Sequence, residues 1–192
     1  MLPEEIMGDD LAQRIDSVFR PLPAYRVALD GVEQHTPDAS GEVLVQGGNV
    51  MAGYWQNPEA TCETLRDGWL HTGDLGSFDA DGRLSIVGRL KDVIRSGSSS
   101  VIPKEVEDVI ASHPAVGEVA VLGLPDTEWG EAVTAFVVLR PGMSATEQDL
   151  VEHCRAHLAS YKKPRVVQFV TSLPRSHYGK VIRAELLAQV VK

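Results

Sequence analysis

Alternating apolar and polar side chains predict β-strands in the first half of the chain. The alternation runs through residues 25–29 and 42–46, as in strands with one buried face. Residues 57–65 begin with Asn-Pro-Glu and predict a short helix with proline in its first turn. The pair Asp81-Gly82 lies between two further apolar runs and predicts a tight hairpin turn. The first half is therefore expected to be mainly β.

The second half of the chain mixes helical and strand periodicities. Pro103 begins a segment whose apolar residues fall at i, i+3 and i+4, which predicts an amphipathic helix. Ser144-Ala-Thr-Glu147 has the pattern of a capping box at the start of another helix. The order of elements predicts an α+β domain with a three-stranded sheet and flanking helices. The expected strands are 117–122, 132–139 and 166–170, with a Pro-Asp loop between the first two, and a closing helix is expected at 183–190.

Between the two halves lies a charged stretch, Gly88–Gly97, which by itself is typical of a connector between folded parts. The strands before it resemble part of a larger sheet or barrel whose other strands are missing. The segment after it, of about 100 residues, is long enough to bury a core of its own. In residues 1–24 the pattern supports only a possible short helix.

Composition narrows the class of protein. The chain has 192 residues, of which 43% are hydrophobic, as in ordinary globular proteins. The acidic start MLPEEIMGDD lacks the apolar block of a signal peptide, and no apolar run is long enough to span a bilayer. Cys62 and Cys154 form at most one disulfide, so no disulfide framework is implied. We therefore expect a cytoplasmic protein.

Charge distribution says more than net charge. The formal net charge of −9 argues against a general nucleic-acid-binding protein. Residues 160–184 nevertheless contain six basic side chains and no acidic one. Either this segment is a solvated basic face, or it binds a small ligand that carries phosphate.

Two residues are candidates for binding or chemistry. Asp74 follows Thr-Gly at the end of an extended segment, where its carboxylate can accept hydrogen bonds from a diol such as ribose. The alternative is an aspartate that caps its own turn. Lys180 follows Gly179, which allows close backbone approach, so its ammonium can meet phosphate or carboxylate oxygens. The alternative is an exposed loop lysine.

Other patterns are weaker. The glycine-rich segments do not precede Gly-Lys-Ser/Thr, so no P-loop is present. His153 and His157 have the i, i+4 spacing of a metal pair, with Cys154 between them. Because no third ligand is evident, we favour a solvated helix face and expect no metal site there.

Seven segments together resemble the C-terminal part of AMP-forming acyl-CoA synthetases. They are, in order, GNVMAGYWQNPEAT, DGWLHTGDLG, DADGRLSIVGRLKDVI, IPKEVE, GLPDTEWGE, YKKP and LPRSHYGKVIR. These enzymes belong to the adenylate-forming superfamily, which also includes luciferases and the adenylation domains of peptide synthetases. The resemblance covers the chain from about Arg20 onward. The sequences of the motifs are most similar to those of the acyl- and aryl-CoA ligases, including those of fatty acid metabolism.

The resemblance implies a two-step reaction. A carboxylate attacks the α-phosphate of ATP, with Mg²⁺, to give acyl-AMP and pyrophosphate, and the thiol of CoA then displaces AMP. By match to the family motifs, Asp74 would hold the ribose hydroxyls and Arg89 would contact the nucleotide. Lys180 would stabilise charge at the carboxylate and the α-phosphate. Lys91 would be the hinge about which the small domain turns between the half-reactions.

The loop after the hinge departs from the family pattern. In the family it lines the passage for the CoA thiol arm, which assigns Gly97, Ser98, Ser99 and Ser100 to that passage. The family normally has glycine where this chain has Ser98. A serine there would narrow the passage, or demand backbone angles that serine disfavours.

The resemblance divides the chain into residues 1–88, an incomplete β-rich distal part of the large domain, a hinge at 89–92, and a C-terminal domain at 93–192. The family's phosphate loop and most of its acyl pocket lie upstream of anything in this chain, so we expect no catalysis by the chain alone. Two alternatives stay open. One is a non-catalytic module that binds nucleotide or another protein. The other is a catalytic half that works in trans with a separate large domain.

Overall fold

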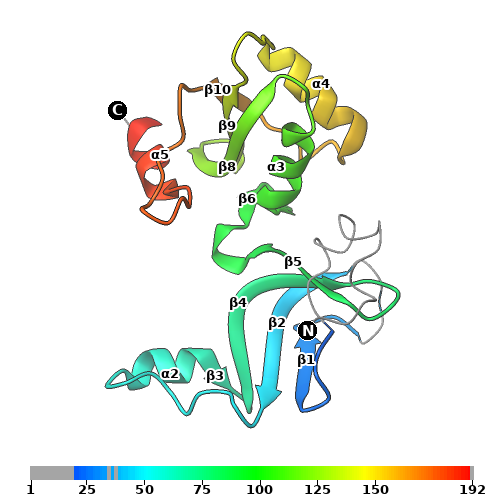
Figure 1. Ribbon diagram of the computed structural model, residues 1–192, viewed down its shortest axis with the longest axis vertical. Coiled ribbons are helices and arrows are strands. Elements are labelled where there is room, and N and C mark those ends of the chain that lie inside the picture. Colours follow the sequence, from blue (N-terminus) through cyan, green and yellow to red (C-terminus); the bar gives the residue numbers. More distant parts are fainter. Residues whose placement is uncertain (1–19, 34–35, 37–38, 191–192) are drawn as a thin grey trace, which may run out of the picture. The chain divides into compact units, whose positions relative to one another are not determined.

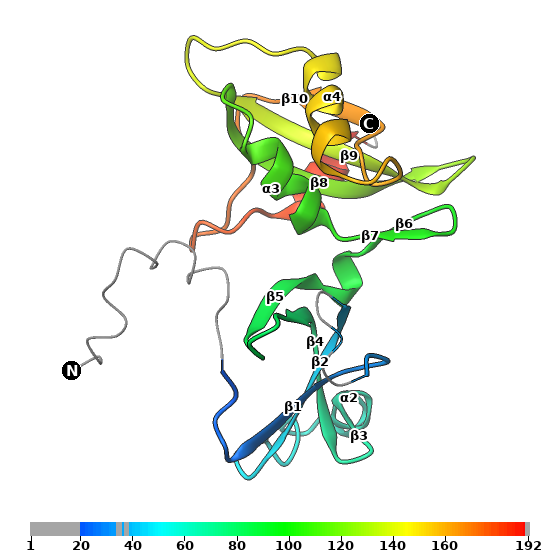
Figure 2. The same ribbon diagram turned by 90° about the vertical axis from the view of Figure 1, so that its right-hand side faces the viewer.

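The computed structural model describes residues 20–33, 36 and 39–190. They form two compact units, one ending at Lys91 and the other beginning at Asp92 (Figures 1 and 2). Both units combine a small sheet with helices, so the predicted α+β class is confirmed. The short helix considered for residues 1–24 falls largely outside the described residues.

The first unit is built, in its described part, on a five-stranded antiparallel sheet. The long strand β4 is central, because β2 follows it along its length while β3 and β5 pair with its opposite ends. Leu29, Val43 and Leu84 form its small buried core. The elements are β1 (Tyr25–Leu29), β2 (Ser40–Gly47), α2 (Pro58–Thr64), β3 (Leu65–Arg66), β4 (Trp69–Phe78) and β5 (Leu84–Arg89).

Local sequence signals account for the helix and the hairpin of this unit. Asn57 caps α2 by accepting a hydrogen bond from the Ala60 amide at 3.0 Å, and proline occupies the first turn, as predicted. The β4–β5 turn is closed by a hydrogen bond from the Gly82 amide to the Asp79 carbonyl at 3.0 Å. Gly82 has a φ of 73°, a conformation that favours glycine.

The second unit is built around strand β9. It pairs antiparallel with β8 over a long hairpin, parallel with β10, and with the short strand β6 through Ser96 and Gly130. The three predicted strands are present, and the hairpin of β6 and β7 adds two short ones. The elements are β6 (Ile94–Ser96), β7 (Ser99–Val101), α3 (Pro103–Ala111), β8 (Val116–Asp126), β9 (Gly130–Leu139), α4 (Glu147–His157), β10 (Val166–Phe169) and α5 (Arg183–Val190).

Helices cover both faces of this second sheet. Alternate residues of β8 and β9 point to opposite faces, so each face has a separate apolar cluster. One face packs against α3 and α4, and the other packs against α5 (Figure 1). The first cluster includes Val121, Val133, Val106, Ile110, Leu150 and Cys154, and the second includes Ala120, Leu122, Phe136, Leu173 and Leu186.

Two details of the second unit differ from the sequence-based expectations. Pro125 and Asp126 belong to strand β8 rather than to a loop, because the hairpin ladder continues to the pair Asp126 and Gly130. The capping box lies two residues later than predicted. Thr146 is the N-cap of α4, and the Asp149 carboxylate accepts a hydrogen bond from the Thr146 amide at 2.8 Å.

Candidate nucleotide site and hinge

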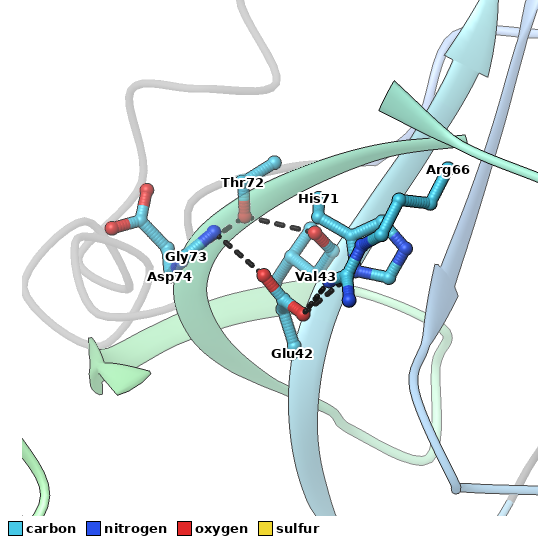
Figure 3. Close-up of polar contacts among 7 residues, drawn as sticks. All are labelled: Glu42, Val43, Arg66, His71, Thr72, Gly73 and Asp74. Carbon is cyan, nitrogen blue, oxygen red and sulfur yellow. Dashed lines mark hydrogen bonds and ion pairs between the residues drawn. The ribbon is translucent and has the colours of Figure 1, made fainter. Parts of the chain in front are cut away.

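The Thr-Gly-Asp segment forms a bulge in strand β4. Glu42 of β2 faces Leu75, whereas Leu44 faces His71, so three residues of β4 (72–74) lie opposite one residue of β2. A bulge of this kind removes backbone groups from the ladder and changes the direction of the strand. The segment is held in this shape by side chains of both strands (Figure 3).

Two side chains replace the missing ladder hydrogen bonds. The Glu42 carboxylate accepts a hydrogen bond from the Gly73 amide at 2.9 Å. The Thr72 hydroxyl donates to the Val43 carbonyl at 2.8 Å and accepts from the Asp74 amide at 3.1 Å. Gly73 has a φ of 72°, which a side chain would strain. The backbone of the bulge is therefore fixed at each of its three residues.

Glu42 is a buried charge, with 8% of its side chain exposed. Burial alone would raise the pKa of Glu42, but its hydrogen bond with His71, the one donated by the Gly73 amide, and the charges of His71 and Arg66 lower the pKa below its ordinary value. The Nδ1 atom of His71 also lies 2.8 Å from Arg66 Nη2. The His71 Nδ1 atom lies 2.8 Å from one carboxylate oxygen, and Arg66 Nη2 lies 3.9 Å from the same oxygen. The folded state therefore holds Glu42 ionised.

The bulge presents Asp74 beside Arg89, the two residues predicted to contact nucleotide. They are partners across β4 and β5, and Arg89 Nε lies 3.1 Å from Asp74 Oδ1. The Asp74 side chain is 33% exposed and that of Arg89 is 59% exposed, so solvent reaches both. In Figure 3 the Asp74 carboxylate points away from Glu42. The structure thus brings together an acceptor for hydroxyl groups and a planar cation.

The predicted hinge residue Lys91 lies in a single 3-10 turn, η2 (Leu90–Asp92), at the end of the first unit. The next residue, Asp92, is held within the second unit by Arg183, whose Nη1 atom donates to its carboxylate at 2.6 Å. The other terminal nitrogen of Arg183 donates to Glu107 at 3.1 Å. The sequence identifies Arg183 only as a basic residue at the start of the closing helix, and no local pattern predicts its contact with Asp92.

The predicted passage loop comprises the turn of the β6–β7 hairpin, residues 97 and 98, and the first two residues of β7. Gly97 has a φ of 62°, and its amide donates to the Trp129 carbonyl at 2.7 Å. Ser98 and Ser100 are exposed, and Ser99 is partly buried. Among the described non-glycine residues, only two have positive φ, and Ser98 is not one of them. Of the two alternatives for Ser98, disfavoured backbone angles are therefore wrong, because Gly97 takes the left-handed conformation, and a narrowed passage stays a prediction.

Lys180 lies on a braced turn before α5. The Gly179 amide donates to the Ser176 carbonyl and the Ser176 amide donates to the Lys180 carbonyl, both at 2.8 Å. Arg175 donates to the Gly179 carbonyl at 2.5 Å and to Glu118 of β8 at 2.7 Å, which ties the turn to the sheet. Lys180 itself is exposed. It belongs to the second unit, whereas Asp74 and Arg89 belong to the first.

Of the two histidines with metal-pair spacing, His153 contacts α3, whereas His157 is exposed and lies near the His153 carbonyl of its own helix. The His153 Nε2 atom lies 3.1 Å from the Val109 carbonyl and 2.8 Å from the Ser112 hydroxyl, and burial lowers the pKa of His153. In the part of the chain that is described, no group of three or more His, Cys, Asp or Glu side chains has the arrangement of a metal site. Cys62 and Cys154 are both thiols.

Among helices in the described ranges, none is both long enough and apolar enough to cross a membrane.

Comparisons with known proteins match this architecture. A family model described as the AMP-binding enzyme C-terminal domain matches residues 105–180. The chain is 44% identical over 179 residues to a long-chain-fatty-acid–CoA ligase of Escherichia coli O157:H7, which covers 92% of this chain and 32% of that protein. The chain thus spans about a third of the length of the curated relatives it matches.

Solved structures show the same relationship. The amide bond synthetase McbA from Marinactinospora thermotolerans has a TM-score of 0.84 at 39% identity, covering 94% of this chain and 38% of that one. The o-succinylbenzoate CoA synthetase MenE from Bacillus subtilis, in complex with the acyl-adenylate OSB-AMP, has a TM-score of 0.79 at 35% identity, covering 93% and 37%. Residues 105–180 therefore match the AMP-binding enzyme C-terminal domain, and the chain as a whole is similar to about a third of each of these adenylate-forming enzymes.

Proposed function

We propose that this chain is the nucleotide-holding and hinge portion of an acyl-CoA ligase. The reaction joins a carboxylate to CoA through an acyl-AMP intermediate, with ATP as the source of AMP and Mg²⁺ bound to its phosphates. The observation that carries the proposal is the pairing of Asp74 with Arg89, 3.1 Å apart, just before the boundary at Lys91 and Asp92. A nucleotide held there lies next to the point about which a second unit can turn.

Asp74 and Arg89 have complementary roles in this proposal. The carboxylate of Asp74 accepts hydrogen bonds from the ribose hydroxyls, as acidic side chains do in other nucleotide sites. Arg89 is charged at any physiological pH and presents a planar set of donors. In the absence of nucleotide it holds Asp74 by an ion pair that solvent can reach, so little free energy is lost when a ribose replaces that contact.

Lys180 supplies positive charge to the adenylation step. Negative charge develops on the α-phosphate as the carboxylate oxygen attacks, and a positioned ammonium stabilises it. The braced turn supports this role, because the hydrogen bonds of Arg175 to Gly179 and Glu118 limit the movement of the lysine backbone. Positioning of this kind contributes directly to rate.

Lys91 allows the second unit, proposed as residues 93–192, to turn against the portion before residue 89. In one orientation Lys180 reaches the carboxylate and the α-phosphate. In the other it is withdrawn and the Gly97–Ser100 loop lines the route of the CoA thiol. Such domain rotation between half-reactions is a known way to use one active site for two steps.

The chain by itself is proposed to be catalytically incomplete. It spans about a third of the length of its curated relatives, and its glycine-rich segments do not have the Gly-Lys-Ser/Thr pattern of a P-loop. A large domain, fused or supplied in trans, would complete the site and select the carboxylic acid. The alternative is a module that binds nucleotide or protein without catalysis, for which the Asp74–Arg89 pair is also suited.

A chimeric enzyme tests the proposal. The matching C-terminal third of the Escherichia coli long-chain-fatty-acid–CoA ligase is replaced by this chain, and the two half-reactions are measured separately. Adenylation is measured as the carboxylate-dependent exchange of pyrophosphate into ATP. Thiolysis is measured as the release of AMP when acyl-AMP and CoA are supplied. The isolated chain is expected to show no exchange, whereas the chimera restores it.

The variant Lys180→Ala assigns the role of the lysine. It is expected to slow adenylation by roughly 10²–10³-fold while leaving thiolysis nearly unchanged, because only the first step develops charge at the lysine. Lys104→Ala, an exposed lysine of α3 paired with Asp108, is the matched control and should change neither step. Equal loss of both half-reactions in Lys180→Ala would contradict the assigned role. Exchange by the isolated chain would contradict its incompleteness.

A further inference from the structure

The bulge that carries Asp74 depends on a side chain outside the sequence motif. Three residues of β4 face one residue of β2, so the ladder cannot supply partners for all their backbone groups. A buried amide without a partner is costly, and proteins supply a substitute acceptor. For the Gly73 amide that acceptor is Glu42, at 2.9 Å.

Burying an ionised carboxylate to accept a hydrogen bond from one amide costs hydration free energy. A neutral side chain would satisfy one amide with less loss of hydration than Glu42, which is 8% exposed. Its second oxygen is occupied by His71, at 2.8 Å, and it is near Arg66, at 3.9 Å. The charge is therefore held on both sides, which fixes the orientation of the carboxylate as well as its presence.

A series of contacts connects His71 to Asp74, the residue proposed to bind the ribose. His71 orients Glu42, Glu42 holds the Gly73 amide, and Gly73 precedes Asp74. The Asp74 carboxylate itself makes no contact with Glu42 and points away from it (Figure 3). Glu42 thus acts on the backbone of the bulge and leaves the Asp74 side chain available to a ligand.

We propose that Glu42, oriented by His71, is a positioning residue that fixes where Asp74 meets the ribose of the nucleotide. This inference rests on the proposed function of Asp74. A residue that only stabilised the sheet would affect all nucleotides alike. A residue that places Asp74 affects most strongly those nucleotides that have the hydroxyl groups Asp74 binds.

The test compares ATP with 2′-deoxy-ATP and 3′-deoxy-ATP in the adenylation step of the chimera. Glu42→Ala is expected to lower kcat/KM for ATP by roughly tenfold or more, since a small displacement of a binding group has effects of this order. The preference for ATP over the deoxynucleotides should shrink at the same time. Glu42→Gln keeps an oxygen acceptor for Gly73 and should retain most of the preference.

A double-mutant cycle with Asp74 separates positioning from general destabilisation. In the Asp74→Ala background, Glu42→Ala is expected to lower kcat/KM for ATP by less than about twofold, because the two changes act on one interaction. The proposal is overturned if Glu42→Ala lowers the use of ATP and both deoxynucleotides equally. It is also overturned if its effect is undiminished without Asp74.

A measurement on the 192-residue chain keeps this test independent of the proposed function. Hydrogen exchange of residues 72–75 is compared in the unmodified chain, Glu42→Gln and Glu42→Ala, with β8 and β9 of the second unit as an internal reference. Glu42→Ala is expected to speed exchange at Gly73 and Asp74 by tenfold or more, on the order expected for loss of one buried charge-assisted hydrogen bond. Unchanged exchange at these amides overturns the positioning role. If Asp74→Ala leaves the preference for ATP intact while exchange responds to Glu42, the assignment of Asp74 to ribose fails instead.

Discussion

Arg183→Ala is expected to destabilise the second unit by loosening its first residue. The guanidinium of Arg183 holds Asp92 at 2.6 Å and Glu107 at 3.1 Å, and these contacts join α5 to the first residue of the second unit and to α3. Removing the arginine leaves two carboxylates, 21% and 17% exposed, without their shared cation. The loss of the two contacts and the exposure of two partly buried carboxylates to each other without a cation both raise the free energy of the folded second unit.

The magnitude follows from burial. Buried hydrogen bonds to charged groups contribute about 1.5–3 kcal/mol each, whereas exposed ion pairs contribute about 0–1 kcal/mol. Because Arg183 is 36% exposed, solvent screens it, and we take a value near the lower limit for the two contacts together. We therefore expect a loss of about 1.5 kcal/mol, which lowers Tm by roughly 6–12 °C for a unit of this size.

Urea-dependent hydrogen exchange measures this loss for each unit separately. This choice matters because two units need not unfold in one transition. Arg183→Lys is expected to recover less than half of the stability, because an ammonium cannot span both carboxylates as a planar fork does. Arg155→Ala, on the exposed side of α4, is the matched control and should change stability by less than about 0.5 kcal/mol. A change in Arg183→Ala no larger than this control, or an equal loss in the first unit, would refute the reasoning.

Three further outcomes are expected. Gly97→Ala should lower the free energy of unfolding by about 1–2 kcal/mol, measured by chemical denaturation, because its φ is 62° and a Cβ would lie 3.1 Å from a tryptophan ring. Ser98→Ala should be nearly neutral, and an equal loss of stability in the two variants would contradict this. Burial raises the pKa of the Cys154 thiol to about 11, so a thiol reagent should label exposed Cys62 quickly and Cys154 only as the unit opens; two fast thiols would contradict this. The folded pKa of Glu42 is lowered from its ordinary 4.5, so the unfolded chain binds more protons on acidification. The contribution of Glu42 to the stability of the first unit should be complete above about pH 4.5 and be lost as the pH falls through the lowered pKa, with a shallower loss in Glu42→Gln.

Local features of the fold could be predicted from the sequence. The start of α2 follows from Asn57 and the proline after it, and the hairpin at Gly82 follows from its turn residues, because neighbours in sequence make these contacts. The start of α4 shows the limit of such reasoning. Ser144 with Glu147 and Thr146 with Asp149 both fit a capping pattern, and the structure has the second.

Some residues of the candidate site could likewise be predicted from local sequence, and others could not. Asp74 and Lys180 could be proposed from their motifs, although their roles stay predictions. Glu42 could not, because a glutamate in an alternating strand has the pattern of a solvent-facing position, and its partner Gly73 lies 31 residues away. Arg183 and Asp92 are separated by 91 residues, and no local pattern indicates their contact. Contacts of this range depend on the register of strands and the docking of helices.

The hairpin of β6 and β7 separates two kinds of constraint on sequence change. Ile94 and Val101, at its base, are buried in the core of the second unit, so substitutions there carry a cost in folding. Ser98, at its tip, is exposed, and its replacement leaves that core intact. Variation at the tip can therefore accumulate without loss of the fold. If the tip lines the route of the thiol, the chain can adapt to a different acyl acceptor by changing a few surface residues.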